Sequence, residues 1–185
     1  GIELLEDNMQ PGASDRQLIA QIMGATDQMQ TQLDALRRIA AAREPRYYGH
    51  SNLMQVAAAL GAQYPSLTVR NSGAPDSVPL AGDGVRLILG HLFANAVQNG
   101  ARQVVLDGNA DAERVDVTVT DDGAGISGGN EGQVFDPFFT TRRDAGGTGM
   151  GLAIVAALLG AHGGEITLIP SDSGAAFRLT FRVSA

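Results

Sequence analysis

The feature of this sequence that most constrains its fold is an alternating apolar run that ends in two carboxylates and spaced glycines. Residues 115–119 read V-D-V-T-V, the pattern of a strand with one buried face. The letters T-D-D-G-A-G-I follow at residues 120–126. Asp121, at the strand end, can accept a hydrogen bond from an exocyclic amine, and Gly123 and Gly125 let the backbone approach a flat ring. Adenine has both features, although turn chemistry alone also produces this pattern.

The composition excludes several classes of protein. The chain has 185 residues, of which 44% are hydrophobic, enough for one large domain or a medium domain with an appendage. Its formal net charge is -7 and it contains no lysine, so it lacks the basic face of a nucleic-acid-binding protein. No apolar run approaches the roughly 20 residues that span a bilayer, and we expect no membrane contact. The absence of cysteine excludes disulfides.

The N-terminal part of the chain predicts one long helix. Ser14, with Gln17 three residues later, is typical of a capped helix start, and no proline follows until Pro45. The expected helix of roughly 30 residues is ~45 Å long. Its apolar residues alternate steps of three and four, the stripe of a helical bundle or coiled coil, although packing on its own domain is an alternative. They are Leu18, Ile22, Ala25, Met29, Leu33, Leu36 and Ile39 or Ala40.

A break at residues 44–46, E-P-R, indicates a domain boundary, so we assign residues 1–46 and 47–185 to separate domains. The second domain mixes helices and strands without strict alternation. This favours an α+β fold, a two-layer sandwich in which helices cover one face of a mixed sheet. Asp83 is expected to cap one of its helices. Expected helices span residues 51–60, 83–99 and 150–161, and expected strands span residues 67–70, 78–80, 103–106, 114–120, 165–169 and 176–183.

The helix expected at residues 83–99 carries a polar strip. His91, Asn95, Gln98 and Asn99 fall at helical spacing and converge on one side. Mg²⁺ takes oxygen ligands and keeps several waters, so an asparagine carbonyl together with nucleotide phosphates is a suitable shell. A solvated polar surface explains the same spacing.

Two further motifs follow along the chain. Residues 135–141 read F-D-P-F-F-T-T, an aromatic cluster that core packing alone also explains. Residues 142–152, R-R-D-A-G-G-T-G-M-G-L, open a helix. Glycine-rich backbone at a helix N-terminus offers N–H groups and a favourable dipole to a phosphate, and two arginines add charge-assisted hydrogen bonds. The run lacks the Gly-Lys-Ser/Thr of a P-loop and does not open a βαβ unit.

In this order the four motifs resemble the Asn box, first glycine box, Phe box and second glycine box of the GHKL ATPase superfamily. They are most similar to the catalytic domain of bacterial sensor histidine kinases, and the resemblance covers residues 83–183. It implies the GHKL two-layer α/β sandwich, with ATP and Mg²⁺ as cofactors. Residues 161–166, A-H-G-G-E-I, resemble the closing turn of that family, which makes His162 structural. Residues 139–147 resemble the compact ATP lid of nitrogen-regulation-type kinases.

The resemblance implies a role for each matching residue. Asn95 would bind the Mg²⁺ that bridges the phosphates, and Asp121 would accept a hydrogen bond from the adenine amino group. Asn95 and His91 are the implied catalytic residues, with His91 as a base or water-positioning group where the family more often has Asn or Glu. Gln98 stands where the family often has a Lys or Arg that reaches the phosphates. Arg142 or Arg143 would supply that positive charge instead. The other implied ATP-binding residues are Asn99, Gly123, Gly125, Ile126, Phe138, Arg142, Gly147, Thr148, Gly149, Gly151 and Leu152.

The long N-terminal helix resembles the second helix of the family's dimerisation and phosphotransfer hairpin, with residues 1–8 as the end of the first helix. The family's phosphoacceptor is a histidine followed by Asp or Glu and then by arginine. None of the three histidines, His50, His91 and His162, has this context. We therefore expect the phosphoacceptor to precede Gly1 in a longer parent protein.

The function implied is that of the ATP-binding core of a two-component sensor histidine kinase, which transfers the γ-phosphoryl group to a histidine and then to a response regulator. Expected partners are the receiver domain of that regulator and a second copy of the full-length protein. The expected location is cytoplasmic, with an anchor of the parent protein in the inner membrane left open. Alternatives are another GHKL ATPase or anti-sigma serine kinase, and a non-catalytic dimerising or regulator-binding module on the same fold, which His91 and Gln98 keep open.

Overall fold

The computed structural model describes residues 18–19, 22–24, 29–30, 33–34, 36–37, 40–143 and 147–183. By its contacts the chain divides into two compact units, Gly1–Asp34 and Ala35–Ala185. The domain boundary expected at residue 46 stays a prediction. No helix in the described part of the chain has the length and apolar character needed to cross a membrane.

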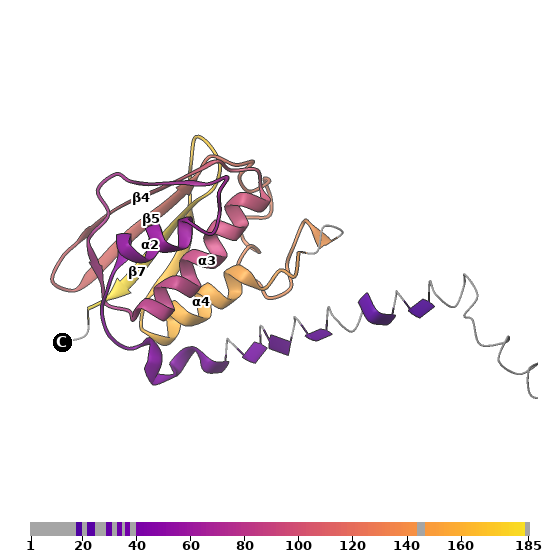
Figure 1. Ribbon diagram of the computed structural model, residues 1–185, viewed down its shortest axis with the longest axis horizontal. Coiled ribbons are helices and arrows are strands. Elements are labelled where there is room, and N and C mark those ends of the chain that lie inside the picture. Colours follow the sequence, from indigo (N-terminus) through magenta and orange to yellow (C-terminus); the bar gives the residue numbers. More distant parts are fainter. Residues whose placement is uncertain are drawn as a thin grey trace, which may run out of the picture. The chain divides into compact units, whose positions relative to one another are not determined.

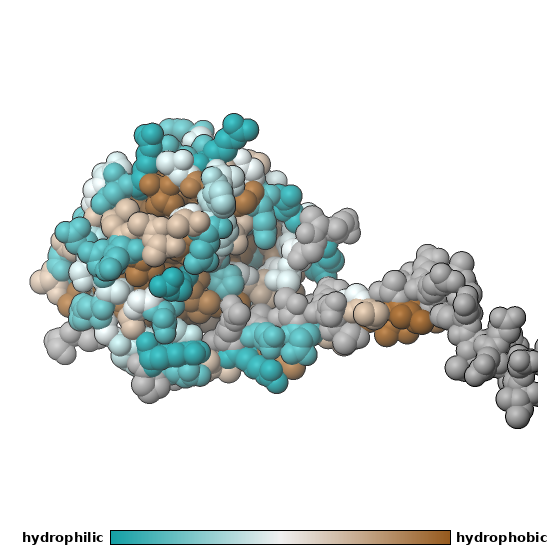
Figure 2. All heavy atoms as spheres, viewed as in Figure 1, coloured by the Kyte–Doolittle hydropathy of each residue, from teal (hydrophilic) through white to brown (hydrophobic). Residues whose placement is uncertain are grey.

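The described residues of the N-terminal unit are helical, as predicted. Large apolar side chains lie at the surface of this unit, and Figure 2 shows apolar atoms there. Leu18, Ile22, Met29 and Leu33, four members of the predicted stripe, are between 45% and 69% exposed. The helix start expected at Ser14 lies outside the described residues.

The second unit is built on a mixed five-stranded sheet in the order β2-β4-β5-β7-β6. β2 runs parallel to β4, and the other neighbours are antiparallel. A separate two-stranded sheet joins β1 and β3. The strands are β1 (Ser51–Asn52), β2 (Thr68–Asn71), β3 (Ser77–Val78), β4 (Gln103–Ala110), β5 (Arg114–Asp121), β6 (Glu165–Ile169) and β7 (Ala176–Arg182).

Three α-helices cover one face of the five-stranded sheet (Figure 1). The valines of β5 that were predicted to face the core are buried, whereas the polar residues between them are partly exposed. The α+β two-layer sandwich expected from the sequence is therefore confirmed. The helices are α2 (Leu53–Gly61), α3 (Gly82–Gln98) and α4 (Gly151–Ala161), preceded by the short 3-10 helices η1 (Ala41–Arg43) and η2 (Pro45–Tyr47).

The segment around η1 and η2 packs against the end of α4. The Nε2 atom of His162 lies 3.1 Å from the carbonyl oxygen of Ala42. The rings of Tyr48 and His162 are 4.6 Å apart between centroids. Ala42 and Tyr47 are buried in the core. These contacts give His162 a structural role, as expected.

Several local predictions differ from the structure. Residues 51–52, expected to begin a helix, form β1, and α2 begins at Leu53 because the Asn52 side chain caps it by accepting from the Gln55 N–H. The strand expected at residues 78–80 is β3, which ends at Val78.

The N-cap of α3 is Ala81, without a side-chain hydrogen bond, so the prediction that Asp83 caps this helix is wrong. Asp83 instead lies in the first turn, where its negative charge is favourable to the helix dipole. β4 extends four residues beyond the predicted end because its pairing with β5 continues to Ala110 opposite Val115.

Candidate functional site

The polar strip predicted on α3 lies along one edge of the buried face of that helix. His91, Asn95 and Asn99 are half-buried, and Gln98 is exposed. Buried neighbours such as Leu92 and the other apolar residues of α3 hold the helix on the sheet. The strip is therefore presented by a fixed element beside the C-terminal end of β5.

Asn95 and Asn99 are coupled by hydrogen bonds. The Asn99 side-chain amide donates to the backbone oxygen of Asn95 at 2.8 Å and to its Oδ1 at 3.2 Å. Oδ1 of Asn95 is thereby held in place and keeps a second lone pair for a ligand. Across the residues that the structure describes, no three His, Cys, Asp or Glu side chains gather as a metal-binding group. A cation at Asn95 would therefore complete its shell with phosphate oxygens and water.

Asp121 ends β5 and is only 7% exposed. Its Oδ1 accepts hydrogen bonds from the backbone N–H groups of Gly123 at 2.8 Å and Ala175 at 3.2 Å. Its own N–H donates to the carbonyl oxygen of Ala175 at 2.9 Å. Within the described residues no donor reaches Oδ2. One carboxylate oxygen is thus fixed by the backbone, and the other can accept a hydrogen bond from a ligand.

The glycines around Asp121 permit close approach between backbone segments. A Cβ on Gly123 would lie 2.9 Å from the carbonyl oxygen of Asn99. Gly125 has a φ of +72°, and a Cβ there would lie 2.7 Å from the carbonyl oxygen of Gly174. Gly174 has a φ of +62° and lies directly against the Asp121 backbone. The protein's own packing therefore requires these glycines, whether or not a flat ring also lies on them.

A cavity of about 700 Å³ lies beside this loop, within the range of small-molecule sites. Ile126 and Phe135 face the edge strand β6 across it. Ala175, the residue bonded to Asp121, also lines it, so the cavity adjoins the buried carboxylate. Of the predicted ATP-binding residues, all of which lie in the described part of the chain, Ile126 alone belongs to its wall; Asn95, Asp121, Phe138 and the glycines of both boxes do not. The lining consists of Ile126, Glu131, Phe135, residues 166–171 and residues 174–176.

The Phe box and the second glycine box lie directly against each other. The Phe138 N–H donates to the carbonyl oxygen of Gly149 at 2.9 Å. Gly149 has a φ of +68°, and a Cβ there would lie 2.5 Å from Phe138 C and from Phe139 O. Phe138 itself has a φ of 69°, which is rare for a bulky residue and costs free energy. Such strained residues cluster at ligand-binding sites.

Two arginines connect the predicted lid to neighbouring backbone. The Arg142 guanidinium donates to the carbonyl oxygen of Gln98, at the C-terminal end of α3, where a positive charge is favourable. Arg143 donates to the carbonyl oxygen of Phe138 at 3.2 Å. The structure therefore brings Arg142 next to position 98, whereas the expected contact of Arg142 or Arg143 with a phosphate stays a prediction. Residues 144–146 lie outside the described residues.

The beginning of α4 borders the polar strip. A Cβ on Gly151 would lie 3.3 Å from Nδ1 of His91, so the imidazole packs against this glycine. The Nε2 atom of His91 is buried. Leu152 is half-buried and packs on the core. The N–H of Met150, the residue before α4, donates a weak hydrogen bond to Oγ1 of Thr148 at 3.4 Å.

The second glycine box is also compact before α4. A Cβ on Gly147 would lie 2.7 Å from Oγ1 of Thr140 and 2.9 Å from the carbonyl oxygen of Arg142. The Gly147 N–H donates to that carbonyl oxygen at 3.0 Å. A glycine is therefore required at position 147 because the loop backbone packs closely against Thr140 and Arg142 there.

Asp122 is a site residue that sequence reasoning missed. Its Oδ1 accepts hydrogen bonds from the N–H groups of Arg102 at 2.7 Å and Gln103 at 2.9 Å. The N–H groups of Gln103 and then of Arg102 hold the pKa of Asp122 below its ordinary value of 3.8. The sequence signal is the pair of adjacent carboxylates, of which only the first was assigned.

Comparison with known proteins places this geometry among nucleotide-binding domains. A family model described as "Histidine kinase-, DNA gyrase B-, and HSP90-like ATPase" matches residues 81–185. The sensor histidine kinase ZraS of Salmonella typhimurium is 36% identical over 107 residues, which are 56% of this chain and 23% of ZraS. The sensor histidine kinase RcsC of Escherichia coli is 32% identical over 154 residues, which are 76% of this chain and 16% of RcsC. The chain therefore spans less than a quarter of either relative.

Solved structures have the same fold. The crystal structure of the ATP binding domain of PrrB from Mycobacterium tuberculosis matches with a TM-score of 0.59 and 29% identity, over 72% of this chain and 92% of that chain. The Acinetobacter baumannii histidine kinase AdeS matches with a TM-score of 0.66 and 16% identity, over 98% of this chain and 90% of that chain. The second likeness bears on the fold alone.

Proposed function

Because the chain belongs to the histidine kinase-, DNA gyrase B- and HSP90-like ATPase family, we propose that it is the ATP-binding catalytic core of a two-component sensor histidine kinase. The reaction is transfer of the γ-phosphoryl group of ATP to a histidine and then to an aspartate of a response regulator. The observation that carries the proposal is the buried Asp121 carboxylate, of which one oxygen is fixed by backbone N–H groups and the other has no donor among the described residues.

The adenine end of the nucleotide is assigned to the loop after β5. Oδ2 of Asp121 accepts a hydrogen bond from the exocyclic amino group of adenine. Guanine has a carbonyl at that position and cannot donate this hydrogen bond. Gly123, Gly125 and Ile126 line the base. Support comes from the cavity wall, to which Ile126 contributes an apolar side chain.

The metal end is assigned to α3. Oδ1 of Asn95, held by Asn99, would be the protein ligand of a Mg²⁺ ion, and phosphate oxygens and water would complete its shell. The residues present fit this ion because Mg²⁺ is commonly held by few protein oxygens together with substrate phosphates. When bound, it neutralises charge on the phosphates.

The triphosphate is assigned to the second glycine box at the start of α4. Backbone N–H groups of Thr148, Gly149 and Gly151 are assigned to it, and the helix dipole favours its charge. The Gly147 N–H is already bonded to the Arg142 carbonyl oxygen, so Gly147 is assigned to the turn of the lid. Arg142 can turn from the Gln98 carbonyl to a phosphate, which replaces the cation missing at position 98. Phe138 and Leu152 contribute apolar contacts on either side of this box.

Catalysis rests on positioning and on electrostatic stabilisation of the transferring phosphoryl group. Asn95 would hold the metal beside the phosphates. The role of His91 as a base or water-positioning group stays a prediction. The packing of its ring on Gly151 supports an additional role in holding the start of α4 against α3.

The partners and location follow from the same proposal. The proposed protein substrates are two. One is the segment that carries the phosphoacceptor histidine, and the other is the receiver domain of a response regulator. The exposed apolar residues of the N-terminal unit support pairing with a second copy of the protein. The domain acts in the cytoplasm, where ATP is available.

Calorimetric titration with a non-hydrolysable ATP analogue and Mg²⁺ tests the proposal, with Asp121→Asn as the variant. Asparagine keeps the oxygen that accepts from Gly123 and Ala175 but presents an N–H group to the adenine amine. The unchanged chain is expected to bind, and the variant to bind at least about tenfold more weakly with little loss of stability. Equal affinities would refute the assignment of Asp121. Absence of binding to the unchanged chain would favour the non-catalytic module.

A further inference from the structure

Asp122 is exposed, yet its carboxylate holds a segment that is distant in sequence. Oδ1 accepts from the N–H groups of Arg102 and Gln103, 20 and 19 residues away. The Asp122 N–H also donates to the carbonyl oxygen of Gln103 at 3.3 Å. The backbone donors keep this pKa below 3.8, so the group is a carboxylate at neutral pH. Asp122 therefore joins the loop after β5 to the turn between α3 and β4.

The turn that Asp122 holds directly follows α3, the helix that carries the proposed metal ligand Asn95. The Ala124 N–H donates to the carbonyl oxygen of Asn99 at 3.0 Å. The Asn99 side chain in turn donates to Oδ1 of Asn95 at 3.2 Å. The loop after β5 is thus attached on both sides of Gly123. Asp122 holds residues 102–103 at the start of β4, and Ala124 holds Asn99 at the end of α3.

We infer that Asp122 is a positioning residue that fixes the spacing between the adenine end and the metal end of the nucleotide site. The inference rests on the proposed function, which assigns these ends to Asp121 and Asn95. A nucleotide contacts both ends at once, so its affinity depends on their separation, whereas a ligand that contacts one end does not sense it. Small displacements of positioned groups are costly to function.

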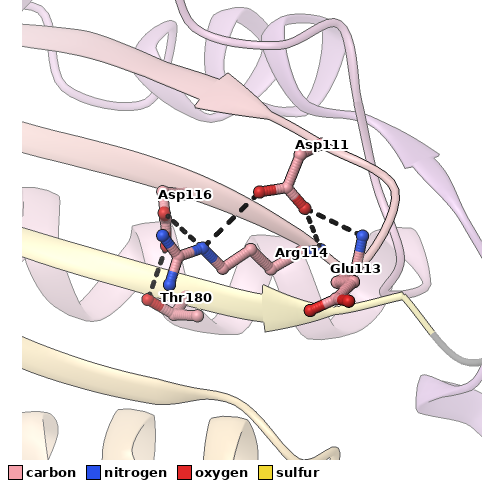
Figure 3. Close-up of polar contacts among 5 residues, drawn as sticks. All are labelled: Asp111, Glu113, Arg114, Asp116 and Thr180. Carbon is pink, nitrogen blue, oxygen red and sulfur yellow. Dashed lines mark hydrogen bonds and ion pairs between the residues drawn. The ribbon is translucent and has the colours of Figure 1, made fainter.

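Asp111 is a matched control at the other end of the same strand. It precedes β5, whereas Asp122 follows it. Its Oδ1 accepts from the N–H groups of Glu113 at 2.8 Å and Arg114 at 2.9 Å (Figure 3). These two donors, in that order, hold its pKa below 3.8. Asp111 is also exposed. Its hydrogen bonds and its ion pair with Arg114 at 3.8 Å lie within its own turn at the other end of β5.

The experiment compares two ligands on the full chain, a non-hydrolysable ATP analogue with Mg²⁺ and adenosine, by competition titration. Asp122→Ala is expected to weaken the analogue about tenfold and adenosine less than about twofold. Asp111→Ala is expected to leave both affinities within about twofold of the unchanged chain. Thermal unfolding of both variants accompanies the titrations, so that a loss of affinity is compared at known stability.

Two further substitutions separate geometry from charge and remain informative if Asp122→Ala does not fold. Asp122→Asn keeps an acceptor oxygen at the same distance and is expected to bind the analogue within about twofold of the unchanged chain. Asp122→Glu keeps the charge but moves the carboxylate by one methylene, and is expected to weaken the analogue. The reverse order, with the glutamate variant normal and the asparagine variant weak, would overturn the inference.

The remaining outcomes are also decisive. If Asp122→Ala and Asp111→Ala bind the analogue equally well, Asp122 has no positioning role and the proposed function stands. If Asp122→Ala weakens adenosine as much as the analogue, Asp122 supports the base pocket alone and the inference fails. If the unchanged chain binds neither ligand, the proposed function and this inference fail together.

Discussion

Gly174 makes the tightest backbone contact near the candidate adenine pocket. At a φ of +62°, a Cβ there would overlap the Asp121 carbonyl and lie 2.6 Å from its Oδ1. Gly174→Ala is therefore expected to cost about 1–3 kcal/mol of unfolding free energy and to weaken nucleotide binding. Gly128→Ala is the control, because a Cβ on Gly128 meets nothing within 4 Å, and its cost should stay within about 0.5 kcal/mol.

Urea unfolding of both glycine variants measures the difference. A Gly174→Ala variant as stable as Gly128→Ala would show that the segment before β7 relaxes away from Asp121 without cost. The carboxylate would then not depend on this backbone contact for its position.

At the scale of single residues, the sequence predicted the positions of the candidate site residues better than it predicted why those residue types are needed there. Asn95 and Asp121 lie as expected at the ends of α3 and β5. Gly123 and Gly125 were assigned to contact with a flat ring, whereas the structure shows backbone neighbours from Asn99 and Gly174. The tie made by Asp122 was missed because it depends on the α3–β4 turn lying beside the end of β5, a tertiary contact that leaves no local pattern.

At the scale of elements, the inner strand β7 carries one of the largest fully enclosed side chains of the core, Phe177. Phe177 is 2% exposed, and its ring lies 6.3 Å from that of Phe135. Phe177→Ala is expected to destabilise the second unit by about 3–5 kcal/mol, because it leaves a cavity in the core. Phe138→Ala removes a ring of the same size that is 38% exposed, and is expected to cost about 1 kcal/mol or less.

Thermal and urea unfolding of the two phenylalanine variants checks this expectation. Similar losses in both would mean that the Phe box supports the fold as much as the sheet does. A loss of nucleotide affinity in Phe138→Ala without a loss of stability would instead support its assignment to the site.

The predicted element boundaries were accurate where buried and exposed residues alternate regularly. They were inaccurate where hydrogen bonding to a neighbouring strand sets the end of a strand. β5 and β6 were located to within one residue because their apolar periodicity is regular. β4 continues through the polar residues 107–110, which carry no strand pattern, because β5 provides hydrogen-bonding partners along that length. The start of α3 was misassigned because Asp83 resembles a cap, while the helix begins one residue earlier, after Ala81.

At the scale of the whole molecule, the histidines determine what this chain can do alone. His91 packs on Gly151 and His162 on Ala42, and none of the three histidines precedes an acidic residue and an arginine. After incubation with MgATP, mass spectrometry under conditions that preserve phosphoramidates is expected to find no phosphohistidine on this chain. The control is nucleotide binding measured on the same sample. Detection of phosphohistidine on any of the three would contradict the assignment.

The family and the fold could both be predicted because four short motifs keep their order along one half of the chain, and the matching family model covers residues 81–185. The resemblance to sensor histidine kinases is thereby confirmed. The N-terminal helix shares a periodicity rather than a motif with other bundle helices, so its partner cannot be predicted from the sequence.

The pairing of β5 with β7 has a consequence for how the protein acquires its activity. This pairing joins residues 114–120 to residues 176–182, and the pocket around Asp121 is closed by Ala175, just before β7. Contacts so distant along the chain form slowly, because a long loop must close first. A chain emerging from the ribosome would therefore lack the proposed adenine pocket until β7 is made. Nucleotide affinity would then appear abruptly, as a signature of completed folding.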